Sequence, residues 1–265
     1  MAPPNTPPHY DELPLGTLDP DRVEALWRYQ HLERRRQLVL PDGRMDLVAH
    51  ATVHRDGRID AVSLAIAGPA DQPCAMQLRP GVLSLGARFR LGWGGVCFGL
   101  EPALARNRVI VGPQASALLG ALAPPLQQCR SVDALQAALA HTAGVLSAGA
   151  ASDARHAGAL RAIARLRRHV AADRTRRPPT DTAREAERSM RRHVLAATGL
   201  SLRSLAGVLR FQHAMDLLTS GAVASLAELA ALAGYADQPH MTRAFRRFGG
   251  FTPALPVATP VVGAR

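Results

Sequence analysis

The chain has 265 residues, 47% of them hydrophobic, and its formal net charge of +11 comes from 32 basic residues that are all arginine. This length and composition allow a sizeable buried core and suggest two domains. Three widely spaced cysteines, Cys74, Cys97 and Cys129, argue against a disulfide framework and favour the reducing cytoplasm. The N-terminus lacks the apolar core of a signal peptide and no run of about 18 apolar residues occurs, so we expect no membrane span.

The charge is uneven along the chain. Residues 1–150 carry 14 arginines and 13 acidic residues, whereas residues 151–265 carry 18 arginines and 8 acidic residues. The net charge is therefore +1 in the first part and +10 in the second. A near-neutral front and a basic back are typical of a sensing or assembly domain joined to a domain that binds a polyanion.

The front of the chain is predicted to be mostly β. Residues 1–20 are rich in proline and are expected to form a disordered arm. Residues 21–148 show short apolar runs separated by turn signals such as Pro41-Asp42-Gly43, which predicts a small β domain that ends in helices. The expected elements include a helix over 21–32, strands over 45–54, 59–67, 82–90, 95–100 and 109–112, and helices over 116–122 and 131–147.

Residues 149–253 are predicted to be all-helical. We expect helices over 155–174 and 201–219, and the second of these would be roughly 27 Å long at 1.5 Å per residue. Pro256 and Pro260 forbid a further helix, so residues 254–265 are expected to form a disordered tail.

The stretch 225–253 predicts two short helices joined by a tight turn. Ser225 and Glu228 have the spacing of a capping box at the start of the first helix. Gly234 supplies the left-handed residue that ends this helix. Asp237 is an N-cap for the second helix, and Pro239 lies near its first position, where a missing N–H costs nothing.

The second helix is amphipathic. Met241, Phe245 and Phe248 recur at helical spacing and would bury against the first helix. The opposite face is polar and basic, as in the helix that a helix–turn–helix presents to the major groove. An ordinary helical hairpin with a solvated basic face fits the same pattern. The candidates for base contacts are Gln238, His240, Thr242 and Arg243, and those for phosphate contacts are Arg246 and Arg247.

This stretch, SLAELAALAGYADQPHMTRAFRRFGGFTP, resembles the second helix–turn–helix of the AraC/XylS family of bacterial transcription regulators. The likeness extends upstream to Glu187. It implies a DNA-binding domain in which two helix–turn–helix units are joined by the helix over 201–219, with double-stranded DNA as the partner. The matching residues are Leu229-Ala230, Gly234-Tyr235, Thr242-Arg243, Phe245-Arg246, Gly250 and Thr252-Pro253.

The first unit of this pair departs from the family. The resemblance places its recognition helix before Thr198, where the matching candidates for DNA contacts are Arg188, Ser189, Arg191 and Arg192. Family members carry an apolar helix and a Gly-containing turn just ahead of it. Here residues 176–186 contain two prolines and few apolar side chains, which cannot give the same packed helix. We therefore predict a degenerate first unit and treat its four residues as weaker candidates.

The front domain resembles, more loosely, an uncharacterised N-terminal domain of some AraC-type regulators. The similar segments are LVLPDGRMDLV at 38–48, AGP at 67–69 and GARFR at 86–90. Members often show Pro-Gly after the Arg-Phe pair, where this chain has Arg90-Leu91-Gly92. In better-known relatives the front domain is a β-barrel that binds a small effector or dimerises, so the resemblance raises a small-molecule effector and a homodimer as partners.

Nothing in the sequence favours an enzyme, a metal site or a cofactor. His50 and His54 have a ligand-like spacing but no third ligand nearby. Cys74 and Cys129 lack a reactive-cysteine motif and are predicted to be buried structural residues. The run Gly92-Trp93-Gly94-Gly95 carries no lysine and is not expected to open a helix, which argues against a phosphate loop.

The sequence thus predicts an α+β protein with a small, mostly β N-terminal domain, closing helices and an all-α C-terminal domain. The predicted function is a cytoplasmic, sequence-specific DNA-binding transcription regulator. The alternative is an effector-binding or dimerisation protein that has only non-specific DNA affinity because its first unit is degenerate. Survival of binding against competitor DNA at physiological salt distinguishes the two.

Overall fold

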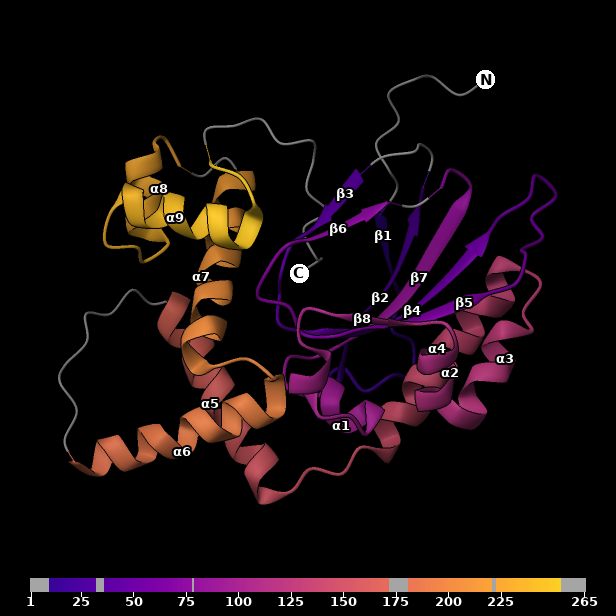
Figure 1. The fold of residues 1–265 in the computed structure, drawn as a ribbon, viewed down its shortest axis with the longest axis horizontal. Coiled ribbons are helices and arrows are strands. Elements are labelled where there is room, and N and C mark those ends of the chain that lie inside the picture. Colours follow the sequence, from indigo (N-terminus) through magenta and orange to yellow (C-terminus); the bar gives the residue numbers. More distant parts are fainter. Residues whose placement is uncertain (1–9, 32–35, 78, 172–180, 221–222, 254–265) are drawn as a thin grey trace.

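The computed structural model describes residues 10–31, 36–77, 79–171, 181–220 and 223–253. It has a β-rich front part and an all-helical back part (Figure 1), so the predicted fold class is confirmed. The strands are β1 (Tyr10–Leu13), β2 (Val23–Gln30), β3 (Arg36–Val39), β4 (Met45–Thr52), β5 (Ser63–Ala67), β6 (Cys74–Gln77), β7 (Val82–Phe89) and β8 (Val109–Val111). The helices of the front part are α1 (Gly94–Phe98), η1 (Pro102–Ala105), α2 (Pro113–Leu119), η2 (Gly120–Leu122), α3 (Ala123–Gln127) and α4 (Val132–Gly149). Those of the back part are α5 (Ala154–Ala171), α6 (Asp181–Thr198), α7 (Leu202–Thr219), α8 (Leu226–Leu232) and α9 (Gln238–Gly249).

One antiparallel sheet organises the front part. Its six strands run in the order β1-β2-β7-β4-β5-β8, and β3 pairs with β6 in a separate two-stranded sheet. Strand β7 lies between β2 and β4 and is buried on both faces. Gly86 in β7 is required there, because a Cβ at this position would lie 2.1 Å from the Trp27 ring.

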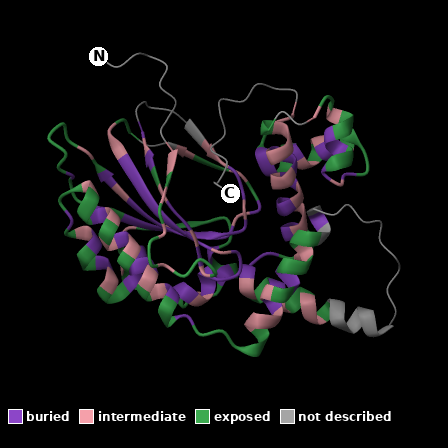
Figure 2. Cartoon of the chain, turned by 180° about the vertical axis from the view of Figure 1, so that it is seen from behind, coloured by how far each residue is buried: buried purple, intermediate pink, exposed green. Residues whose placement is uncertain are grey.

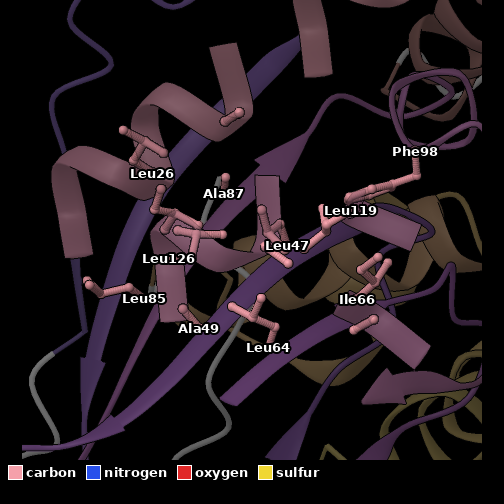
Figure 3. Packing of buried hydrophobic residues seen from close by; sticks show 14 of the residues in the cluster. Leu26, Leu47, Ala49, Leu64, Ile66, Leu85, Ala87, Phe98, Leu119 and Leu126 are labelled. Atoms are coloured by element: carbon pink, nitrogen blue, oxygen red, sulfur yellow. The ribbon is translucent and has the colours of Figure 1, made fainter. Parts of the chain in front are cut away.

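The main core lies between this sheet and helices α1 to α4, which cover one of its faces (Figure 1). Leu47, Ile66 and Leu85 on the sheet point toward Leu119 and Leu126 on the helices (Figure 3). Leu47, Ile66, Leu85 and Leu126 are 0% exposed. Burial of side chains of this size, at roughly 1.5–3 kcal/mol each, is the dominant stabilising contribution to this half of the chain.

The other face of the sheet carries buried ion pairs. The Arg88 guanidinium lies 3.2 Å from the Asp46 carboxylate, which also accepts a hydrogen bond from Trp27 Nε1 at 3.1 Å. Arg44 Nη2 donates to Glu24 at 2.7 Å. Since each charge has a partner, these groups can remain ionised in a buried setting, and removing one partner would leave the other uncompensated.

Three expectations from the sequence are wrong. Residues 21–32 do not form a helix, because residues 23–30 are strand β2. Residues 95–100 do not form a strand: the five-residue helix α1 begins at Gly94, so this Gly-rich run does open a short helix. The disordered arm expected over residues 1–20 is wrong for residues 10–13, which pair with β2 as strand β1. Residues 1–9 and the tail over 254–265 lie outside the described residues.

Helix α7 of the back part makes hydrogen bonds with two loops of the front part. Asp71, on the β5–β6 connection, accepts hydrogen bonds from Ser204 Oγ on α7 and from Arg106 Nη2, the latter at 2.6 Å. Further along α7, Gln212 Nε2 donates to the Pro41 carbonyl at 2.9 Å. Because both acceptors belong to loops of the front part, the front domain holds α7 at two points along its length.

We expect the stability of the folded protein at low pH to depend on the ionisation of Asp71. Burial by itself raises the pKa of Asp71, but hydrogen bonds from Arg106, Ser204 and Asn107 outweigh it and lower this pKa from 3.8 to about 2. A carboxyl whose pKa is lower in the folded state stabilises that state above its unfolded pKa and loses this contribution as the pH falls through the folded pKa. Between about pH 4 and pH 2, the Tm of the wild type should therefore fall more steeply than that of Asp71→Asn.

Asp60→Asn is the control, because the Asp60 side chain is exposed and pairs only with His54 among the described residues. Its Tm should follow that of the wild type through the same pH range. Parallel pH dependence in the wild type and Asp71→Asn would contradict the role assigned to Asp71.

Candidate nucleic-acid interface

Helix α8 begins and ends as the sequence predicts. Ser225 Oγ accepts a hydrogen bond from the Glu228 N–H at 3.1 Å. The Glu228 carboxylate returns to the N–H of Ala224 at 2.7 Å, one residue before the cap, so the reciprocal bond of the capping box is shifted. Gly234 has φ +71°, and the Tyr235 N–H donates to the Ala230 carbonyl at 2.8 Å. These bonds satisfy the ends of α8 and turn the chain sharply toward α9.

Helix α9 has defined ends as well. Asp237 Oδ1 accepts a hydrogen bond from the His240 N–H at 2.6 Å, and Pro239 lies in the first turn. At the other end Gly250 has φ +74°, and its N–H donates to the Arg246 carbonyl at 3.2 Å. The helix therefore starts and stops at fixed residues, which sets the direction in which its side chains project.

The apolar face of α9 is buried as predicted. Met241 and Phe245 are 0% exposed and Phe248 is 4% exposed. The Phe245 ring packs edge-on against Phe211 of α7, with centroids 5.1 Å apart. Because α8 and α7 contribute Leu229 and Phe211 to the same cluster, α9 is locked against both helices.

The opposite face of α9 carries all six candidate residues of this helix. Gln238, Arg243, Arg246 and Arg247 are exposed, and His240 and Thr242 are partly buried. Figure 2 shows that the helices of the back part combine buried and exposed stretches. The His240 ring packs edge-on against Tyr235 at a centroid distance of 5.3 Å. The Arg247 guanidinium lies 4.9 Å from the Phe248 ring centroid on its own helix. Arg243 and Arg246 form no ion pair with a described carboxylate and remain available for an external anion.

The candidate residues of the first unit lie on α6. Arg188, Arg191 and Arg192 are exposed, whereas Ser189 is partly buried and accepts a hydrogen bond from Arg192 at 3.4 Å. Nine residues, 172–180, separate α5 from α6 and lie outside the described residues. Helices α5 and α6 pack against each other, with Ile163 and Val170 of α5 in the same cluster as Val194 of α6.

The two candidate sets are separated by the length of α7. Figure 1 shows α8 and α9 at one end of α7 and α5 and α6 at the other. The 18 residues of α7 span roughly 27 Å. This is of the order of the roughly 34 Å that separates successive major grooves on one face of B-DNA.

Two residues of the front domain, Leu40 and Pro73, lie close to helices α8 and α9. Leu40 of the front domain is 4% exposed and belongs to the same cluster as Met241 and Phe245. The nearest heavy atom to a Cβ placed on Gly250 would be Pro73 Cγ of the front domain, 3.7 Å away. No local pattern signals these contacts, because their partners lie about 170 or more residues away along the chain.

The two histidines with ligand-like spacing each contact a polar side chain of the front domain. His54 pairs with Asp60 at 2.7 Å and His50 contacts Ser84 Oγ at 2.8 Å. Within the described ranges, no group of three His, Cys, Asp or Glu side chains could hold a metal ion. Cys129 is buried as predicted, but Cys74 is exposed on the edge of the two-stranded sheet, so that prediction is wrong. Burial raises the pKa of the Cys97 thiol to about 12, which keeps it protonated at neutral pH.

Comparison with known proteins identifies the back part. A family described as a helix-turn-helix domain matches residues 180–255, which contain α6 to α9. No curated protein matches the sequence. Across the described helices, none is by itself long and apolar enough to cross a membrane; a pair bent by 67°, Arg188–Thr198 with Leu202–Thr219, meets the length and composition only when taken together.

Among solved structures, the chain is similar to ToxT from Vibrio cholerae. A variant of apo ToxT aligns with a TM-score of 0.41 at 11% identity over 87% of this chain and 95% of that one. ToxT in another crystal form aligns at 0.40 and 12% identity, over 86% and 96% of the two chains. ToxT bound to an unsaturated fatty acid aligns at 0.40 and 12%, over 86% and 92%.

We expect loss of the N-cap of α9 to destabilise the packed unit of helices α8 and α9. Asp237→Ala removes the acceptor for the His240 N–H and should lower the free energy of unfolding by about 1 kcal/mol. Urea denaturation of the full chain, followed by circular dichroism, measures this loss. Asp237→Asn is the matched control, because its side-chain oxygen can still accept the bond. An equal loss in both variants would show that the cap is not the cause.

Proposed function

We propose that this chain is a transcription regulator of the AraC type, and that it reads a specific DNA sequence through helix α9 of the helix–turn–helix domain at residues 180–255. The observation that supports specific reading is the division of α9 into two faces. One face is fixed in the core by Met241 and Phe245, and the other carries polar and basic side chains. A helix held this rigidly presents the same side chains in the same positions to each base pair.

The roles of the α9 side chains follow from their positions. Gln238, His240, Thr242 and Arg243 occupy the first half of the helix, the half that enters the major groove in this kind of domain. Amide and guanidinium groups can form paired hydrogen bonds with base edges, arginine most often with guanine. Arg246 and Arg247 lie in the last turn and are assigned to phosphates.

The α6 residues have a supporting role in this proposal. Arg188, Arg191 and Arg192 are exposed on helix α6. We assign these three arginines, together with Ser189, to backbone contacts next to the groove that α9 reads. Base reading by α6 would require the docking angle that an apolar helix ahead of it normally provides in this family, and the two prolines and few apolar side chains of residues 176–186 do not fit such a helix.

The front domain is assigned to control and assembly. We propose that residues 21–148 form this domain and residues 149–253 the DNA-binding domain. The front domain is proposed to bind a small-molecule effector and a second copy of the chain. The protein is proposed to act in the cytoplasm. The contacts of Asp71 and Pro41 with α7 support such a role, because they connect the front domain directly to the helix that positions α9.

A second function is favoured by one observation, the two prolines and few apolar side chains in residues 176–186, at the start of the first unit. If α9 alone cannot hold a duplex, the chain is an effector-binding or dimerisation protein with only non-specific DNA affinity. Selection of random duplex DNA by the purified full chain at about 150 mM salt separates these functions. Enrichment of a sequence motif supports the regulator, whereas weak, salt-sensitive binding without enrichment supports the second function.

We expect Arg243→Ala to lose base discrimination. If Arg243 pairs with a guanine, the variant should bind the selected sequence about 1–3 kcal/mol more weakly and should accept other bases at one position. Binding measurements on a panel of single-base variants of the selected duplex test this expectation. A uniform loss on all duplexes would instead place Arg243 on a phosphate.

Arg246→Ala should have the complementary effect. Removal of one arginine–phosphate pair weakens binding to all sequences alike and reduces the slope of log K against log salt by about 0.9. The slope is measured for the wild type and the variant on the same duplex. An unchanged slope would remove Arg246 from the phosphate contacts.

A further inference from the structure

Helix α5 has an unusual distribution of charge. It carries five arginines and no acidic residue over Ala154–Ala171. Three of them, Arg161, Arg165 and Arg168, recur at i, i+4 and i+7 and are all exposed. We refer to these three residues as the α5 stripe. They share one face of the helix, because residues three and four apart are neighbours on a helix surface.

The α5 stripe lies opposite the buried face of the helix. Ala159, Ile163 and Val170 are buried, and Ile163 and Val170 belong to a cluster that includes Val194 of α6 and Leu205 of α7. This packing fixes the rotation of α5 about its axis. The stripe therefore faces outward as a consequence of the fold, with its three side chains free to extend from the surface.

The charges of the α5 stripe are uncompensated. None of the three arginines forms an ion pair with a carboxylate in the described part of the chain. Some arginines of the front part are paired, as in Arg28–Asp11 at 2.8 Å and Arg106–Asp71 at 2.6 Å. Like charges three or four residues apart destabilise a helix, so the stripe opposes the stability of α5 instead of supporting it.

The stripe has a place and a length suited to a duplex. It lies outside residues 180–255, so the helix–turn–helix domain does not include it. In Figure 1, α5 lies beside α6 at the end of α7 that is remote from α9. From Arg161 to Arg168 the helix rises roughly 10 Å, which matches about three phosphates at 3.4 Å of axial rise per strand.

We propose that the α5 stripe binds consecutive phosphates of the duplex that α9 reads, and that it extends the DNA interface beyond the helix–turn–helix domain. This inference rests on the proposed function. The α5 stripe supplies no base reading: three guanidinium groups on one helix face without a neighbouring groove-entering side chain neutralise backbone charge only. It adds DNA contacts at the end of α7 opposite α9.

The test compares two triple variants of the full chain with the wild type. Arg161→Ala, Arg165→Ala and Arg168→Ala together remove the stripe. Arg55→Ala, Arg79→Ala and Arg108→Ala together remove the same charge from exposed arginines of the front domain. The slope of log K against log salt on the selected duplex should fall by about 0.9 for each phosphate that no longer has an arginine partner, hence by about 1.8 to 2.7 for the stripe variant and not for the control. The base preference in a repeated selection should stay unchanged.

Two further results complete the test. Replacement of the same three residues by lysine should retain most of the slope, since the charge remains. Suppose that the wild type enriches a motif but the stripe variant and the front-domain control have equal slopes. This result would overturn the proposed phosphate contacts of the α5 stripe, and the proposed regulator function would stand. A wild type that enriches no motif and binds DNA without a measurable salt slope overturns both proposals. Circular dichroism and Tm of each variant confirm that the comparison is made between folded proteins.

Discussion

The placement of every candidate DNA contact depends on the burial of α7. This helix gives Leu205 and Leu209 to the cluster that holds α5 and α6, and Phe211 and Met215 to the cluster that holds α8 and α9. One helix therefore contributes to two cores along its length. Its length sets the distance between the arginines of α6 and the polar face of α9.

The front domain takes part in the same packing. Leu40 enters the cluster of α8 and α9, Leu91 enters the cluster of α5 and α6, and Asp71 and Pro41 accept hydrogen bonds from α7. A shift of the loops that carry these residues would move apolar and polar contacts together. The front domain and the helices α7 to α9 are thus joined by direct contacts and not only by the chain that connects them.

Two of the wrong predictions, the helix over 21–32 and the strand over 95–100, have a cause in the local sequence pattern. Val23, Leu26 and Trp27 have the spacing of a helix face, yet they lie on strand β2, where a register shift between Val23 and Ala25 disturbs the alternation that marks a strand. Sheet pairing with β1 and β7 on both sides overrode the helical pattern. Helix α1 has only five residues, too few to show a helical period.

The sequence by itself determined the two helices α8 and α9 and the turn between them. The N-caps Ser225 and Asp237, Gly234 at the turn and the apolar spacing of Met241 and Phe245 are local signals, and the structure uses each of them as the physics of helix ends and amphipathic faces requires. Only the tertiary structure decided which distant residues cover this unit and which way α5 turns its arginines. Those outcomes depend on contacts between segments that are far apart in the chain, and no local period encodes them.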